Sequence, residues 1–273
     1  MDRAREKVLL QLGNLIVPIL CIAFITLSNL DFSTVFNSSA YPNMLNPAQI
    51  TFAIWGPIFV FQGIFYFYQA RDLFKPSEKK IDMPYVHEVS VFFMLSWIST
   101  TIWYALWASG FVWPAVAAMY AYLLTSLGAY FRLDINKRER PLIEHLFVTV
   151  PWSMLCGWVT IATIVNTTTG FVSVGFEPGP IGETGWAIIM LVVILIIYLT
   201  VLMTRNDYVF AGVGLWAIMG VLIERSNPLY TRQPWILLTC AFGLLILVTA
   251  MGTKSFLKQE SRKVQTLERR VMD

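Results

Sequence analysis

Uncharged, apolar stretches long enough to cross a lipid bilayer recur along this chain and limit the folds that it can adopt. The stretch from Pro47 to Ala70 is one of them, with 24 residues and no charge. As a helix it would span about 36 Å, which exceeds the ~30 Å hydrocarbon layer of a bilayer. In lipid only helices and closed barrels pair every backbone polar group, and continuous runs of this length favour helices. We therefore expect an all-α integral membrane protein.

Eight segments of this kind can be placed between the polar connections of the chain. They cover about residues 8–28, 47–70, 88–109, 114–131, 143–165, 185–204, 208–223 and 233–253. Charged residues make up only 14% of the chain, whereas a soluble domain carries about 25%. The remaining segment, 254–273, is polar and mixed in charge. The sequence thus predicts a polytopic bundle of eight transmembrane helices followed by a polar tail.

Basic residues divide unequally between the two sides of this predicted bundle. With eight spans, the side that holds both termini carries 18 of the 20 Lys and Arg residues, and the other side carries only Arg225 and Arg232. Loops rich in Lys and Arg remain in the cytosol. We therefore expect a multi-pass membrane protein with both termini and the tail in the cytosol.

The predicted spans lack the residues that most enzymes and ion pathways need. None contains a Lys, Arg, Asp or Glu in its interior, and both histidines, His87 and His145, lie at predicted cytosolic helix ends. No zinc-ligand motif, Cys-x-x-Cys pair, glycine-rich phosphate loop or nucleophile–base motif is present. Ion and proton pathways generally need intramembrane charge. We therefore expect a protein that is not an enzyme, with no metal or resident cofactor and no nucleic-acid partner.

Polar and aromatic side chains share one face of the segment 47–70. At 100° per residue, an arc of roughly 100° holds the following six residues: Phe52, Trp55, Phe59, Gln62, Tyr66 and Gln69. Amide and phenol groups are unfavourable toward lipid, so this face is expected to point into the bundle. Trp103 and Trp107 share a face of the segment 88–109 with Ser96 and Ser99, and Trp158 shares one of the segment 143–165 with Ala162. Such faces fit close helix packing or an aromatic ligand cavity.

Two of these segments resemble a known family. ITFAIWGPIF at 50–59 and PWSMLCGWVTIATIVN at 151–166 are similar to the helix 2 and helix 5 motifs of the tryptophan-rich sensory protein/translocator protein (TspO/MBR) family, in particular its longer relatives. Trp103, Leu106 and Trp107 correspond to the helix 3 pattern W-x-x-L-F. The resemblance covers roughly residues 8–168. Thr100 departs from the family pattern, because it stands where an Asn is common.

The resemblance implies a fold and a type of ligand. Residues 1–168 would form a TspO-like five-helix bundle whose cavity is roofed by the first long loop. The three further transmembrane helices expected in 169–253 have no counterpart in the five-helix members, and 254–273 is the predicted cytosolic tail. The cavity would bind a planar lipophile such as a tetrapyrrole (for example a porphyrin) or a sterol. Its expected lining is Phe52, Trp55, Phe59, Gln62, Tyr66, Trp103, Trp107, Trp158 and Ala162, with Asn166 near the outer mouth.

The expected function is binding, sensing or transport of that hydrophobic ligand. Trp55 and Trp158 would stack on its face, and Gln62 would form the orienting hydrogen bond. Two alternatives remain open at this point. The first is a permease for a small neutral solute, with Gln62, Gln69 and the Ser/Thr face of 88–109 along its path. The second is a structural subunit whose aromatic faces are packed shut. The expected partners are the lipid bilayer and the ligand, and the sequence also allows a homodimer.

Overall fold

The computed structural model describes residues 3–31, 33, 41–228 and 233–272, and this part of the chain is helical and contains no β-strand. Its long helices are α1 (Arg3–Leu27), α2 (Trp55–Ala70), α4 (Phe92–Ala108), α5 (Val112–Arg132), α7 (Val150–Ser173), α8 (Gly182–Arg205), α9 (Tyr208–Arg225) and α10 (Pro234–Met272). The short ones are the 3₁₀ helices η3 (Gln49–Ile54), η4 (Ser77–Lys79) and η6 (Gly179–Ile181), the α-helical turns α3 (Pro84–Val89) and α6 (Leu142–Glu144), and the π-helical turn η5 (His145–Thr149). The predicted all-α fold is confirmed.

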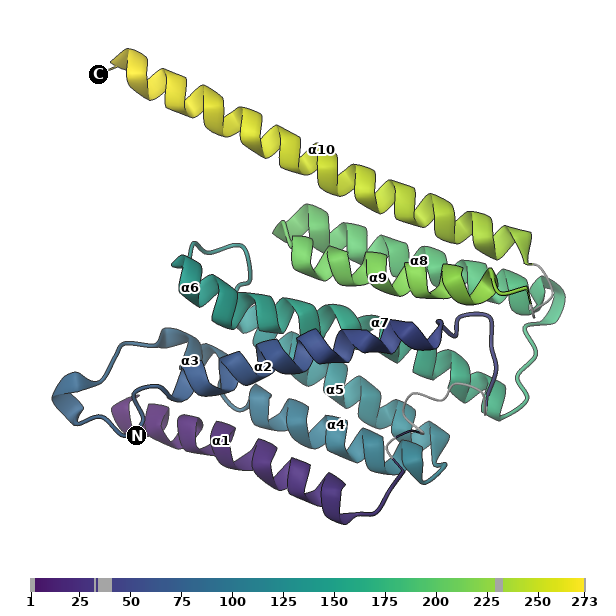
Figure 1. Ribbon diagram of the computed structural model, residues 1–273, viewed down its shortest axis with the longest axis horizontal. Coiled ribbons are helices and arrows are strands. Elements are labelled where there is room, and N and C mark those ends of the chain that lie inside the picture. Colours follow the sequence, from purple (N-terminus) through teal and green to yellow (C-terminus); the bar gives the residue numbers. More distant parts are fainter. Residues whose placement is uncertain (1–2, 32, 34–40, 229–232, 273) are drawn as a thin grey trace.

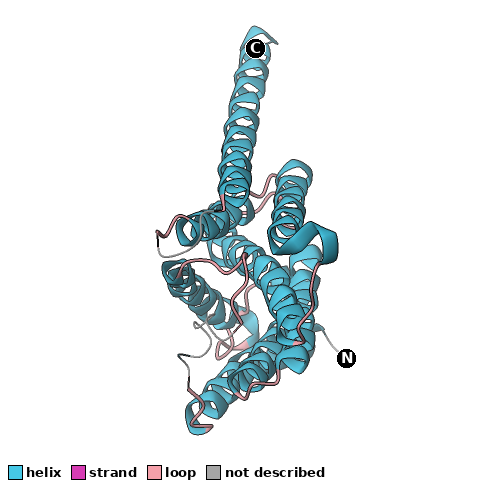
Figure 2. Ribbon diagram, turned by 90° about the vertical axis from the view of Figure 1, so that its right-hand side faces the viewer, coloured by secondary structure: helices cyan, strands magenta, loops and turns pink. Residues whose placement is uncertain are grey.

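The helices lie roughly along one direction, in two groups (Figure 1). The first group contains α1, α2, α4, α5 and α7, and the second contains α8, α9 and α10. Contacts of α9 with α7 and with η3 join the groups, and α10 packs on α8 and α9. The far end of α10 extends beyond the other helices, as both ribbon views show (Figures 1 and 2).

Seven of the described helical segments are long and apolar enough to cross a membrane, which identifies a multi-pass integral membrane protein surrounded by lipid. The eighth predicted span depends on α4, a shorter apolar helix of 17 residues that packs beside α5. At 1.5 Å per residue, α4 rises about 26 Å, close to the thickness of the hydrocarbon layer. The prediction of eight spans therefore rests on this one short helix.

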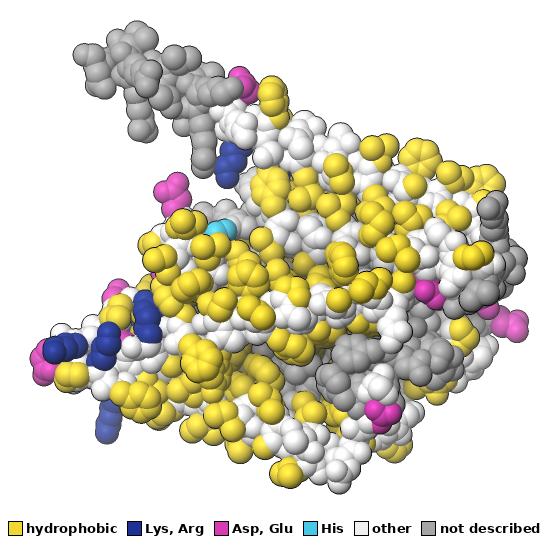
Figure 3. Space-filling view, in the orientation of Figure 1, with side chains coloured by type: hydrophobic (Ala, Val, Ile, Leu, Met, Phe, Trp, Pro, Cys, Tyr) yellow, Lys and Arg dark blue, Asp and Glu magenta, His cyan; other side chains and the backbone are white. Residues whose placement is uncertain are grey.

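Both chain ends lie at the same end of the bundle, as an even number of spans requires (Figure 1). Lys and Arg side chains also gather at that end on the face shown in Figure 3. The assignment of this basic end to the cytosol stays a prediction.

Several helix boundaries differ from those predicted. The segment expected at 88–109 is interrupted at Ser90, whose φ of 51° ends α3 before α4 begins. The π-helical turn η5 precedes Pro151, which cannot donate a backbone hydrogen bond and so disturbs the regular ladder at this point. Near the C-terminus, α10 runs through the boundary predicted at residue 253.

The largest difference is at the end of α7, which continues to Ser173 although the sequence predicted a loop from Asn166. Each of the three threonines at 167–169 donates its hydroxyl to the carbonyl oxygen four residues earlier, at 2.7 to 3.1 Å. These hydrogen bonds satisfy the threonine hydroxyls within α7 itself. Residues 167–169 can therefore remain helical, although threonine-rich segments are common in loops. The domain boundary predicted at residue 168 therefore falls inside a helix.

A buried carboxylate holds three helices together at the basic end. Asp207 has no exposed surface and caps α9 by accepting a hydrogen bond from the backbone N–H of Phe210 at 3.0 Å. Its Oδ2 accepts from the hydroxyl of Tyr130 on α5 at 2.7 Å and from that of Ser153 on α7 at 2.6 Å. The turn between α8 and α9, which looks like a plain connection in sequence, is thus a packing centre.

Gly214 allows α9 to approach α8 closely. A Cβ atom at this position would lie 2.6 Å from the ring of Tyr198, whose hydroxyl donates to the carbonyl oxygen of Gly157 on α7 at 2.8 Å. We expect Gly214→Val to lower the free energy of unfolding by about 1–3 kcal/mol, because the ring must move from a bonded position. Thermal unfolding in detergent measures this, with Gly212→Val as the control, since a Cβ there meets nothing within 4 Å. Equal stability of the two variants would contradict the prediction.

Candidate functional site

A cavity of about 550 Å³ lies between α1, α2 and α4 and is closed at the back by α5 and α7. This volume falls in the range of pockets that hold small organic ligands, about 300–1,000 Å³. Its lining consists of Pro18, Ile19, Ile22 and Ile25 on α1; Trp55, Ile58, Phe59, Gln62, Gly63, Tyr66 and Phe67 on α2; Ser96, Trp97, Thr100, Trp103 and Tyr104 on α4; and Tyr122 and Leu155. None of these side chains is charged.

The large cavity opens sideways, between α1 and α2. Ile19 and Phe59 line it and yet have 57% and 51% of their surface exposed, and Phe67 at its edge has 72% exposed. These side chains lie on helices long and apolar enough to cross a membrane, and hydrophobic side chains predominate on the side of the bundle that Figure 3 shows. The mouth of the cavity therefore faces the hydrocarbon of the bilayer and not water.

A second, smaller cavity of about 70 Å³ lies next to it, toward α9. Its walls come from the loop before η3, from η3 itself and from α2, α4, α5, α7 and α9. Tyr41, Leu45, Asn46 and Pro47 of the first long loop cover it, as the family resemblance implies for a roof. Residues 32 and 34–40 of that loop lie outside the described residues.

All ten side chains predicted to line a cavity border one of these two. Phe52, Trp107, Trp158, Ala162 and Asn166 border the small cavity, Phe59, Gln62 and Tyr66 border the large one, and Trp55 and Trp103 border both. The structure therefore divides the single expected cavity into two chambers, with Trp55 and Trp103 in the partition.

Trp55 of the partition contacts neighbouring aromatic rings directly. The ring centroids of Trp55 and Trp158 are 6.0 Å apart at an interplanar angle of 79°, and Phe52 meets Trp158 at 6.0 Å and 83°. Trp55 also stacks on Phe59 at 5.3 Å. The edge-to-face contacts of Trp158 with Trp55 and Phe52 leave no gap of a ligand's thickness between these rings. Space for a ligand lies on the α1 side of Trp55, and not between Trp55 and Trp158.

Most polar groups of the predicted site already have protein partners. The Gln62 amide nitrogen donates one of its two N–H groups to the carbonyl oxygen of Pro151 at 3.0 Å, and its oxygen can accept a hydrogen bond from a ligand. The Tyr66 hydroxyl donates to the carbonyl oxygen of Leu15 at 2.9 Å. Trp103 donates its indole N–H to Asn166 Oδ1 at 2.9 Å. Asn166 lies inside α7 and not at the start of a loop. The indole nitrogen of Trp158 is buried and has no partner among the described residues.

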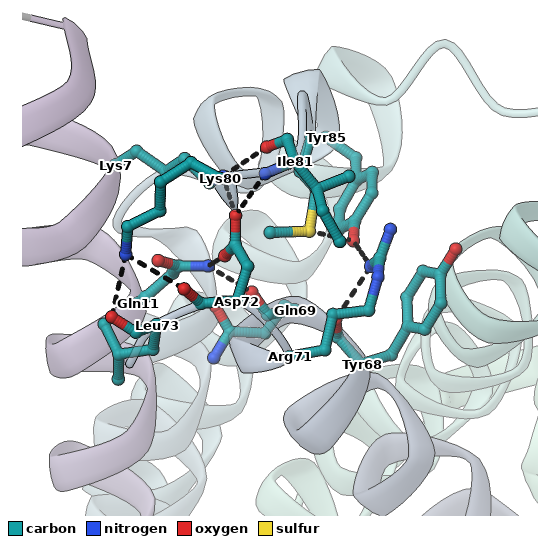
Figure 4. A network of polar contacts seen from close by, with 11 residues as sticks. Lys7, Gln11, Tyr68, Gln69, Arg71, Asp72, Leu73, Lys80, Ile81 and Tyr85 are labelled. Carbon is teal, nitrogen blue, oxygen red and sulfur yellow. Dashed lines mark hydrogen bonds and ion pairs between the residues drawn. The ribbon is translucent and has the colours of Figure 1, made fainter. Parts of the chain in front are cut away.

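Sequence reasoning missed two features of this region. The first is the α1 wall, because Ile19, Ile22 and Ile25 have nothing in their chemistry that distinguishes them from lipid-facing residues. The second is a cluster of polar groups where α1 meets the loop after α2 (Figure 4). There Lys7 Nζ lies 2.6 Å from Asp72 Oδ2, and both side chains are almost fully buried. In the sequence, Lys7 looks like an ordinary positive charge near the N-terminus.

Asp72 is the centre of that cluster. Its Oδ1 accepts from the amide of Gln11 at 2.8 Å, and its Oδ2 accepts from the backbone N–H of Ile81 at 2.8 Å in addition to Lys7. Desolvation by burial acts to raise the pKa of this carboxyl, but the hydrogen bonds from Gln11, Lys7 and Ile81 together outweigh it, so the pKa is lowered. The cluster therefore ties α1 to the C-terminal end of α2 through an ionised carboxylate.

The described residues contain no group of three His, Cys, Asp or Glu side chains that could hold a metal ion.

Comparison with known proteins gives one match. The chain matches the family model described as TSPO-like protein over residues 10–253, which includes α8, α9 and much of α10 as well as the first five predicted spans. No curated protein and no solved structure matches it.

Proposed function

Because this membrane protein belongs to the family of TSPO-like proteins, we propose that it binds a flat hydrophobic ligand, of the tetrapyrrole or sterol class, in the cavity between α1, α2 and α4. Binding is the step common to a sensor and to a transporter of such a ligand. The proposed role is non-enzymatic, because the cavity wall offers no carboxylate, imidazole, thiol or amine to act as acid, base or nucleophile.

One observation carries this proposal: a ligand-sized space that opens toward lipid and has an uncharged wall, in which eight of the 18 lining residues are aromatic. Apolar walls with a few polar groups are typical of small-molecule sites. The indole rings of Trp55, Trp97 and Trp103 offer flat surfaces, and the Gln62 oxygen offers one hydrogen-bond acceptor. A ligand that dissolves in the bilayer would reach the cavity through the mouth between α1 and α2.

The two alternative functions fit the structure less well. A bundle packed shut would not contain a space of this size. A permease path was expected along Gln62, Gln69 and the Ser/Thr face of α4, but Gln69 borders neither cavity and is fully buried beside Asp72. Ser96 donates its hydroxyl to the carbonyl oxygen of Phe93 in its own helix. The side chains of the predicted path therefore do not line one cavity that could pass a solute. A homodimer stays a prediction.

Substitution of Trp55 tests the proposal. Trp55→Ala removes an aromatic wall of both chambers, so we expect the dissociation constant to rise by about tenfold or more once lost contact area is included. Quenching of tryptophan fluorescence by protoporphyrin, and competition by a sterol, measure this with the protein in lipid nanodiscs. Trp235→Ala on α10 is the control, because that side chain is 67% exposed and borders neither cavity. Parent-like binding by Trp55→Ala would refute the assigned cavity.

A further inference from the structure

Polar side chains form two facing stripes between α1 and α2, on the basic-end side of the large cavity. On α1 they are Lys7, Gln11 and Asn14, at spacings of four and three residues, and on α2 they are Gln62, Tyr66 and Gln69, at the same spacings. Such spacing places each set on one face of its helix. Gln11, Asn14 and Gln69 have no exposed surface. We call the contact region between these stripes the polar seam.

Direct contacts show that the two helices meet along this seam. The Gln11 amide donates to the carbonyl oxygen of Gln69 at 2.6 Å as well as to Asp72 (Figure 4). Further along, the Tyr66 hydroxyl donates to the carbonyl oxygen of Leu15. Asn14 precedes Leu15 and lies one turn after Gln11. The seam therefore runs from the Lys7–Asp72 ion pair to Tyr66, which is part of the cavity wall.

Four amide atoms in the seam have no hydrogen-bond partner in the described part of the chain. They are Gln11 Oε1, Gln69 Oε1 and both Oδ1 and Nδ2 of Asn14. Buried polar groups are almost always bonded, and an unbonded one is especially unfavourable at membrane depth. These atoms are three acceptors and one donor. Two water molecules, each of which can donate two hydrogen bonds and accept others, would satisfy them. The Nδ2 donor of Asn14 does not suit a cation.

We infer that the polar seam binds buried water, held by Gln11, Asn14 and Gln69, which connects the Lys7–Asp72 ion pair with the wall of the large cavity. This buried water gives the large cavity a hydrogen-bonded connection to the basic end of the bundle, separate from the apolar mouth between α1 and α2. Water and protons can exchange along it, whereas a flat apolar ligand cannot enter it. The inference does not depend on which ligand the cavity binds.

Exchange of side-chain amide hydrogens tests this inference in the full-length protein. With ¹⁵N-labelled Asn and Gln in lipid nanodiscs, transfer to D₂O is expected to exchange the Asn14 amide roughly tenfold or more faster than that of Asn166. Asn166 is the matched control, because its Nδ2 donates to Ala162 and its Oδ1 accepts from Trp103 in a similarly buried position. Asn14→Leu, or Asn14→Ser where the leucine variant does not accumulate, assigns the signal. An Asn14 amide as slowly exchanging as that of Asn166 overturns the inference.

Thermal unfolding of Asn14→Leu gives a second readout that does not involve ligand. If Asn14 holds water, leucine removes that water and leaves the oxygens of Gln11 and Gln69 without it, so the melting temperature is expected to fall. If the seam is dry, leucine replaces an unbonded amide and the melting temperature rises. A rise overturns the inference, whatever the result of the ligand experiments.

Discussion

Replacing Gly63 with leucine is expected to weaken ligand binding by roughly 10- to 100-fold. This factor corresponds to the about 1–3 kcal/mol that extra side-chain atoms cost in a space that is already filled, here by the ligand. Gly63 lies on α2 in the wall of the large cavity, and a Cβ atom at this position would meet nothing within 4 Å. A leucine side chain would therefore extend into the space that we assign to the ligand. Leucine is a better helix former than glycine, which is about 0.8–1 kcal/mol less favourable than alanine, so loss of binding would not reflect unfolding.

Gly56→Leu is the matched control for this substitution. Gly56 lies in the same helix and also has nothing within 4 Å of an added Cβ atom, but it borders neither cavity. We expect Gly56→Leu to bind protoporphyrin like the parent protein in the fluorescence titration. Equal binding by the two variants would mean that the ligand lies elsewhere.

The second large effect concerns stability and the Lys7–Asp72 pair. Asp72→Ala leaves the buried Lys7 ammonium without its counter-charge and the Ile81 N–H without its acceptor. It also removes one of the two acceptors of the Gln11 amide. Breaking a buried pair from one side costs about 3–5 kcal/mol. We expect a loss of that size in detergent unfolding, with α1 detached first. Glu78→Ala, in the same loop but exposed, is the control and is expected to unfold like the parent. A loss no larger than that of the control would contradict the assigned role.

The pH dependence of stability gives an independent test of the same pair. The folded-state pKa of Asp72 is below its ordinary value of 3.8, so its carboxylate contributes stability that is fully present above that value. This contribution is lost as the pH falls through the lowered pKa. We expect the parent to lose stability below about pH 4 more steeply than Asp72→Asn, which has no such carboxyl group. Parallel pH profiles would show that Asp72 does not contribute in this way.

The aromatic faces of α2, α4 and α7 could be predicted from sequence because they follow a helical period that mixes indoles with polar or small residues. The repeating pattern identifies which side chains share a face, and all ten predicted residues do border a cavity. It does not give the distance between facing rings. The contact between Trp55 and Trp158, and with it the division into two chambers, depends on how close the helices pack.

Features that depend on distant parts of the chain could not be predicted from local patterns. Lys7 and Asp72 are 65 residues apart, and each alone resembles an ordinary charge at a helix end. The α1 wall consists of isoleucines that a lipid-facing helix would equally contain. The extension of α7 beyond Asn166 depends on threonine hydroxyls that bond within the helix, although the same residues are common in loops.

Photo-cross-linking tests most directly whether the ligand occupies the cavity between α1 and α2. A photoreactive sterol added to the protein in lipid nanodiscs is expected to label Ile22 on α1 and Phe59 on α2, which lie at the mouth and line the cavity. Excess unlabelled ligand should abolish this labelling, and so should Gly63→Leu. Labelling confined to the exposed faces of α8 and α10, or labelling of Ile22 and Phe59 that competitor does not reduce, would contradict the assignment of this cavity.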